Sequence, residues 1–178
     1  LRGPQGALYG SDAIGGVISV TTRSGEGPLS VRGSLEGGSF GTFNQSASAS
    51  GSDGGFHYAA TVQHVLASGT PVTPLNLLPP GQRRNDDSYD NLSASTKLGY
   101  DVADNFDIGL TARYSNSLGK ITGDAFNFLT FASTPSPTRT RISTISYQTR
   151  GVAHLVLWDG RFDQTLGLAY GSNIIAAQ

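Results

Sequence analysis

Apolar and polar residues alternate with a period of two along most of the chain from residue 29 onward. This alternation is typical of β-strands with one apolar and one polar face, because successive side chains of a strand point to opposite sides. In the clearest segment, 106–115, every second residue from Phe106 to Tyr114 is apolar. The pattern predicts seven strands, near residues 29–36, 43–50, 56–66, 91–100, 106–115, 142–157 and 162–170.

The connections between these strands alternate in length. From the second strand onward they run short, long, short, long, short. Gly51–Gly55 and Asp159–Gly160 are typical of tight hairpins, because glycine and aspartate tolerate a positive φ. The stretches 67–88 and 118–141 contain prolines, which a central strand excludes, and we expect long irregular loops there. Short turns at one end and long loops at the other indicate an antiparallel transmembrane β-barrel.

Strand length and aromatic residues agree with this all-β prediction. The strands have about ten residues or more, as a tilted membrane span requires. Aromatic residues fall near the predicted strand ends, where we expect them to form girdles at the two bilayer interfaces. They are Phe43, Phe56, Tyr89, Tyr100, Phe106, Tyr114, Tyr147, Trp158, Phe162 and Tyr170.

Composition narrows the classes of function. Charged residues make up 14% of the chain, against about 25% in a typical soluble domain. A net charge of -1 argues against nucleic-acid binding, which needs a basic face. The absence of cysteine excludes disulfides and thiolate chemistry. Because the chain starts at Leu1 and has no methionine, we expect it to be an internal fragment of a longer protein.

Two glycine-containing blocks at the start of the chain carry a family resemblance. They read Arg2-Gly3-Pro4-Gln5-Gly6-Ala7-Leu8-Tyr9-Gly10 and Ala13-Ile14-Gly15-Gly16-Val17-Ile18. In order and spacing they resemble the plug motif of TonB-dependent outer-membrane receptors, and the chain looks loosely like the cobalamin-receptor branch. The resemblance implies that 1–25 is the C-terminal end of a plug domain and that 26–178 is the N-terminal part of the barrel.

The resemblance also implies a function. Such receptors sit in the bacterial outer membrane, surrounded by its lipid, and actively import a scarce nutrient chelate such as a siderophore or cobalamin. The TonB complex supplies energy through an N-terminal part that this chain lacks. By the motif match, Arg2 would contact the barrel wall from the plug. The other motif residues are Gly3, Pro4, Leu8, Tyr9, Gly10, Gly15 and Gly16.

Few other residues indicate chemistry. Gly37–Gly41 has the Gly-x-Ser-x-Gly form of a nucleophile elbow, but strand-like sequence follows where the elbow needs a helix. We expect a hairpin there, no enzymatic activity and no cofactor. Asp86, Asp87 and Asp90 are the candidate metal ligands, since calcium favours clustered carboxylates and cobalamin receptors bind it with aspartates in this loop. A solvated loop rim is the alternative that we favour.

Two other functions stay open. A passive porin-like channel would share the strands and the loop pattern but would lack a plug, and the motif between Arg2 and Ile18 argues against it. A secreted β-solenoid, including a polysaccharide-acting enzyme, would show repeats of similar length. The spacing of the predicted strands varies instead.

Overall fold

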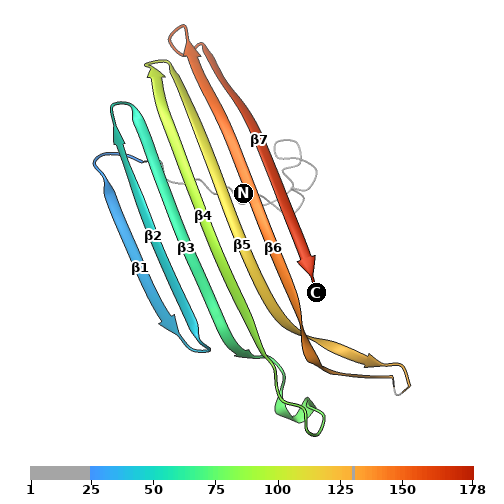
Figure 1. Ribbon diagram of the computed structural model, residues 1–178. Helices are drawn as coiled ribbons and strands as arrows, with labels where there is room; N and C mark the ends of the chain where they lie inside the picture. Colours follow the sequence, from blue (N-terminus) through green and yellow to red (C-terminus); the bar gives the residue numbers. More distant parts are fainter. Residues whose placement is uncertain (1–24, 130) are drawn as a thin grey trace.

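A single antiparallel sheet makes up almost all of the structure (Figure 1). The computed structural model describes residues 25–129 and 131–178. The sheet runs in chain order, so every strand pairs with its neighbour in sequence. The strands are β1 (Ser30–Gly38), β2 (Thr42–Asp53), β3 (Phe56–Pro71), β4 (Asp86–Ala103), β5 (Phe106–Asn127), β6 (Ala132–Leu157) and β7 (Phe162–Ala177). The predicted seven antiparallel strands and all-β class are confirmed.

The register places apolar residues on one side of the sheet and polar residues on the other. Directly paired residues of antiparallel strands share a face. One paired row crosses the sheet as Val31, Ala49, Ala60, Thr96, Ala112, Thr149 and Tyr170, on what we call the apolar face. The next row, on the polar face, runs through Arg32, Ser48, Thr61, Ser95, Arg113 and Gln148.

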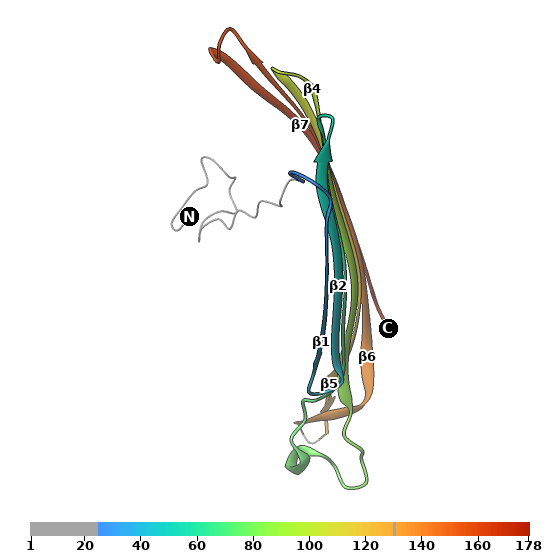
Figure 2. The same ribbon diagram turned by 90° about the vertical axis from the view of Figure 1, so that its left-hand side faces the viewer.

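The sheet is a single layer, as its edge-on view shows (Figure 2). No described side chain is fully buried, and large apolar residues such as Leu110 and Leu168 are exposed at 42% and 77%. A sheet normally buries its apolar face against another layer. Among the described residues, β1 and β7 are the outer strands of the sheet.

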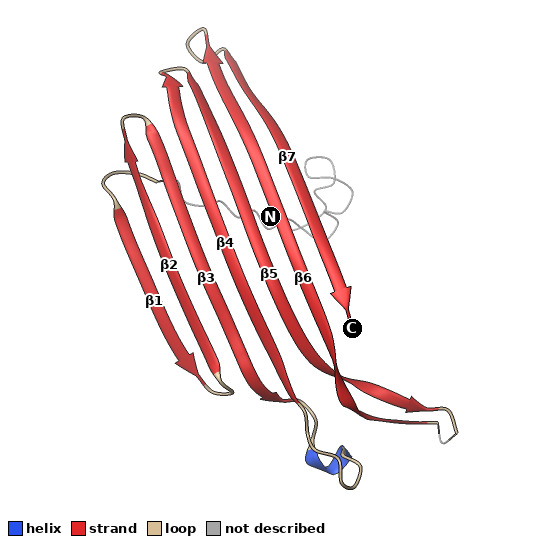
Figure 3. Ribbon diagram, in the orientation of Figure 1, coloured by secondary structure: helices blue, strands red, loops and turns tan. Residues whose placement is uncertain are grey.

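Short turns gather at one end of the strands and longer excursions at the other (Figure 3). Between β2 and β3 the turn is Gly54-Gly55, both with positive φ, as a two-residue hairpin requires. The turn after β6 lies where Asp159-Gly160 predicts it but takes four residues, since Leu157 pairs with Phe162. Gly37–Gly41 forms the β1–β2 hairpin, as expected.

A bulge between β4 and β5 keeps their apolar residues on one face. The ladder leaves the turn with Ala103 opposite Phe106, and an unbroken register would then put Asp101 opposite Ile108. The register shifts by one residue, so that Asp101 pairs with Asp107 instead. A one-residue slip moves a strand's side chains to the other face, so this bulge aligns the two alternating patterns.

The predicted long loop at 118–141 is wrong. β5 and β6 continue as a paired hairpin to Asn127 and Ala132. Pro135 and Pro137 fit because the register jumps from Thr122 opposite Arg139 to Asp124 opposite Pro135, which leaves a bulge at 136–138. Prolines are tolerated at such bulges, where the regular ladder of hydrogen bonds is interrupted.

The predicted loop at 67–88 is present but shorter. It covers residues 72–85, because β3 extends to Pro71 and β4 begins at Asp86. The loop contains a short 3-10 helix, η1 (Leu75–Leu77). In the part of the chain that the structure describes, no helix is long and apolar enough to cross a membrane.

The aromatic residues form one set at the turn end and a second set further along the strands. Phe56, Tyr100, Phe106 and Phe162 lie at or near the turn end of their strands, and the Trp158 ring contacts that of Phe162 at 5.7 Å. Tyr114 and Tyr147, expected at strand ends, lie inside β5 and β6 with ring centroids 5.3 Å apart. The difference arises because the hairpin carries both strands beyond these tyrosines.

Candidate functional site

The polar face is the part of the sheet on which charged side chains gather, and they lie in separate rows. Nearest the turn end is a row of aspartates and histidines contributed by β3 to β7, which we call the carboxylate row. The adjoining paired row begins with His57 on β3, but from β4 to β7 it is nearly free of side chains, because Gly99, Gly109 and Gly167 stand in it beside Val152. The row after that carries cations. The sheet therefore separates negative from positive charge with a strip of glycine.

The cations come from three neighbouring strands. Lys97 on β4 and Arg150 on β6 both pair with Thr111 on β5, so they lie on either side of it in one row. Arg113 lies two residues further along β5, opposite Gln148 of β6. Among the described residues, neither arginine has an ion-pair partner. We call Lys97, Arg113 and Arg150 the cation cluster.

A hollow of about 770 Å³ opens beside the cation cluster. It extends from the cations over the glycine strip to Asp107, and Gln148 and Thr111 also line it. The Arg150 side chain reaches over the strip, since a Cβ at Gly167 would meet its Nε and Nη2 at 3.7 Å. The missing side chains of the strip thus create the space, and the cations border it.

The carboxylate row is built from two histidines that each join two acceptors. His154 Nδ1 lies 2.9 Å from Asp107 Oδ1 and its Nε2 lies 2.9 Å from Asp163 Oδ1. His57 Nε2 lies 2.9 Å from Asp101 Oδ2, and its Nδ1 lies 3.0 Å from the Gly25 carbonyl oxygen. Carboxylate and carbonyl oxygens only accept, so both nitrogens of each ring donate. Each ring carries two protons when it makes both bonds.

Removing one of these histidines tests the row. In the His154→Ala variant, Asp107 on β5 and Asp163 on β7 lose the histidine of β6 that donates to both of them. The two carboxylates then have no donor between them. We expect the amides at the start of β7 to exchange with solvent faster than in the parent protein, since the bond from His154 to Asp163 that ties this part of β7 to β6 is lost. Hydrogen exchange followed by mass spectrometry of the full-length protein measures this, and unchanged protection of β7 would contradict it.

The residues before β1 reach the sheet on the polar face. Gly25 accepts a hydrogen bond from the polar-face residue His57, and Gly27 accepts one of 2.7 Å from the Ser52 backbone amide. Gly25 is buried, and a Cβ there would collide with the carbonyl oxygens of Gly51 and Tyr58. The chain therefore approaches through a contact that only glycine fits, beside the short turns.

One polar group lies on the apolar face, toward the loop end. Gln45 Nε2 donates to His64 Nδ1 at 3.0 Å, and His64 Nε2 donates to Asp90 Oδ1 at 2.9 Å. The His64 ring thus links residues of β2 and β4, accepting at one nitrogen and donating at the other. His57 and His64 lie on opposite faces and share no ligand, as their spacing predicts.

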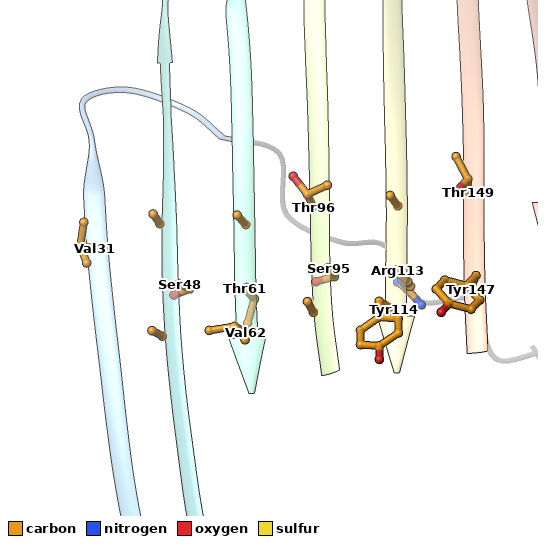
Figure 4. A pocket seen from close by; sticks show the side chains of 15 residues that line it. Val31, Ser48, Thr61, Val62, Ser95, Thr96, Arg113, Tyr114, Tyr147 and Thr149 are labelled. Carbon is orange, nitrogen blue, oxygen red and sulfur yellow. The ribbon is translucent and has the colours of Figure 1, made fainter. Parts of the chain in front are cut away.

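The apolar face also has a shallow hollow of about 620 Å³ in its centre (Figure 4). Val31 lies at one side and Tyr147 at the other, with Val62 and Tyr114 between them (Figure 4). Its floor is formed by small side chains from β2 to β5, which are Ala47, Ala49, Ala60, Ala94 and Ala112. It offers apolar contact and no catalytic group.

The candidate metal ligands do not come together. Asp87 Oδ1 accepts hydrogen bonds from the Thr122 amide and hydroxyl at 2.9 and 2.8 Å, and Asp90 is bound by His64. At Asp86 the contact is through the backbone, whose carbonyl oxygen accepts from Arg139 at 2.7 Å. Within 25–129 and 131–178, no group of three or more His, Cys, Asp or Glu side chains is arranged so that it could hold a metal ion.

These aspartates instead lie where the loop 72–85 meets the β5–β6 hairpin. Gln82 Nε2 donates to the Pro135 carbonyl oxygen at 2.9 Å, and Asn85 Nδ2 donates to that of Ser136 at 3.1 Å. Both carbonyls lie in or beside the proline bulge of β6. The two excursions at the loop end are thus joined by side-chain hydrogen bonds.

The plug-motif predictions lie outside the described residues. They concern Arg2, Gly3, Pro4, Leu8, Tyr9, Gly10, Gly15 and Gly16. Sequence reasoning missed the cation cluster and the carboxylate row. Strand alternation places their members on the polar face, but only the register shows which of them are neighbours.

No protein-family model matches the chain, and no solved structure matches it. The function is therefore inferred from the two faces of the sheet and from the residues on them.

Proposed function

We propose that this chain forms part of the wall of an outer-membrane β-barrel of the TonB-dependent receptor class, which imports a scarce nutrient chelate. The observation that carries the proposal is the single-layer sheet with one continuous apolar and one continuous polar face. A barrel in a membrane needs this arrangement, because its outer surface meets lipid and its interior meets water. The barrel also supplies the missing second layer, since lipid covers the apolar face.

The spacing of the aromatic residues supports a membrane span. On β5, Tyr114 follows Phe106 by eight residues, or about 27 Å along the strand at about 3.4 Å per residue. At a strand tilt of about 40° this is a height of about 21 Å, close to the apolar band of about 25 Å in such barrels. Beyond the tyrosines, the apolar face turns polar with Asn116 and Lys120.

The entry of the chain supports a plugged barrel. Residues 25–27 lie against the polar face at the end with short turns, which is the periplasmic end of an outer-membrane barrel. The sequence that resembles a plug motif ends at the same place. A plug that continues into β1 would therefore lie inside the barrel. In the edge-on view the loop 72–85 also leans to this side (Figure 2).

Antiparallel neighbour pairing argues against a β-solenoid, whose strands stack in parallel. A passive porin-like channel would share the wall, so the experiment has to separate it from an energised receptor. Cells with and without the full-length gene are compared for growth on single siderophores and on cobalamin, and the protein is located by membrane fractionation.

We expect the full-length protein in the outer-membrane fraction and uptake of one chelate that stops when the TonB complex is removed. Uptake that continues without the complex would identify a passive channel and contradict the proposal. A protein found only in soluble fractions would overturn it entirely.

A further inference from the structure

We infer that the cation cluster on the polar face is a binding site for a small oxyanion, a molecule carrying phosphate or carboxylate groups. The first argument is the placing of like charges. Arg113 lies diagonal to Lys97 and to Arg150 on neighbouring strands, at a spacing of about 7–8 Å that long side chains can bridge. Lys97 and Arg150 are separated only by Thr111, and Arg113 lies on the same strand as that threonine. The two arginines gathered in this way favour a bound anion between them.

No described side chain supplies that anion to the arginines. Arg113 and Arg150 form no ion pair within the described ranges. The aspartates of the carboxylate row stand on the far side of the glycine strip and are already bound by His57 and His154. The charge of the two arginines is therefore available to a ligand.

The hollow gives that ligand room. Its volume of about 770 Å³ lies within the range of about 300–1,000 Å³ that is usual for small-molecule sites. Arginine binds phosphate and carboxylate through two parallel N–H donors, and the Gln148 amide, opposite Arg113, and the Thr111 hydroxyl, opposite Arg150, add donors to the lining. On the opposite border Asp107 repels anions, so the negative groups of a ligand are held at the cation cluster.

A small molecule fits better than the start of this chain. Residues 1–24 contain one acidic residue, Asp12, and two basic residues, Arg2 and Arg23, so they bring no surplus of negative charge to the cluster. The binding site is argued independently of the proposed function, and only its consequence for transport rests on that function. If the polar face lines a transport path, the imported chelate is one that carries anionic groups.

The test uses the full-length protein purified in detergent, with inorganic phosphate and citrate as separate probes in titration calorimetry at low ionic strength. We expect at least one of the two to bind, more weakly as salt is added. Arg113→Gln and Arg150→Gln should each weaken binding by roughly ten-fold. The matched control is Arg32→Gln, which removes the same charge from the polar face of β1, outside the hollow.

A second measurement needs no variant. Phenylglyoxal modifies accessible arginines, and mass spectrometry reports which ones react. A bound probe should protect Arg113 and Arg150 and leave Arg32 reactive. No binding of either probe, equal affinity in all variants, or equal protection of all three arginines would each overturn the site. Outer-membrane location without anion binding would overturn this inference alone, whereas anion binding without TonB-dependent uptake would overturn only the proposed function.

Discussion

Arginine in place of Leu110 is expected to destabilise the full-length protein in a bilayer by about 2 to 4 kcal/mol. Leu110 lies on the apolar face of β5, midway between Phe106 and Tyr114. In the proposed barrel this position is the middle of the membrane, where the charge of an outward-facing arginine meets hydrocarbon. Equilibrium unfolding in urea from lipid vesicles measures the free energy of unfolding.

Two control variants on the same strand separate depth and face. Ser115→Arg adds the same charge to the polar face between Ser93 and Ser146, and should cost less than about 1 kcal/mol. Leu118→Arg adds it to the apolar face beyond the tyrosines, beside Asp90, and should also cost less than about 1 kcal/mol. A cost at position 118 equal to that at position 110 would indicate a protein layer over the whole face in place of a bilayer.

The strands and their faces are predictable from sequence because the period of two is a local property. The alternation within a single strand shows which of its sides is apolar, as in β5 from Phe106 to Tyr114. The turns are local as well, since Gly54-Gly55 supplies the two positive φ values that a two-residue hairpin needs. These features decide the order of the strands, since strands joined by short turns pair with each other.

The extent of the strands is less local. Pro135 and Pro137 stop a central strand, and on sequence alone they predict a loop. The strand continues past them because the ladder between β5 and β6 skips residues 136–138, which places Pro137 in a bulge. The bulge at 136–138 can be seen only once β5 and β6 are paired.

The site residues depend on register, which is non-local. Sequence alternation puts Lys97, Thr111 and Arg150 on the polar face, but their common row follows from two separate ladders. The contact between Asp101 and Asp107 requires the one-residue bulge near Val102, which a count from the turn would miss. A cluster made from three strands is therefore not visible in any single segment of the sequence.

The second large effect is expected at Gly25. In the Gly25→Ala variant the new Cβ would meet the carbonyl oxygens of Gly51 and Tyr58, which belong to paired strands and cannot move without breaking the ladder. The entering chain has to shift instead. It then loses the hydrogen bond from His57 to its own carbonyl oxygen and the one from Ser52 to Gly27.

In the proposed receptor this displacement loosens the segment that joins plug to barrel. We expect full-length Gly25→Ala to leak, with a higher ion conductance in planar bilayers and greater sensitivity of the cells to large hydrophilic antibiotics. Gly37→Ala is the matched control, because a Cβ at Gly37 meets nothing within 4 Å and its φ is not in the left-handed region. Equal conductance of Gly25→Ala, Gly37→Ala and the parent protein would mean that the buried contact at Gly25 does not hold the plug. Leakage confined to Gly25→Ala would tie closure of the pore to a position that has room only for glycine.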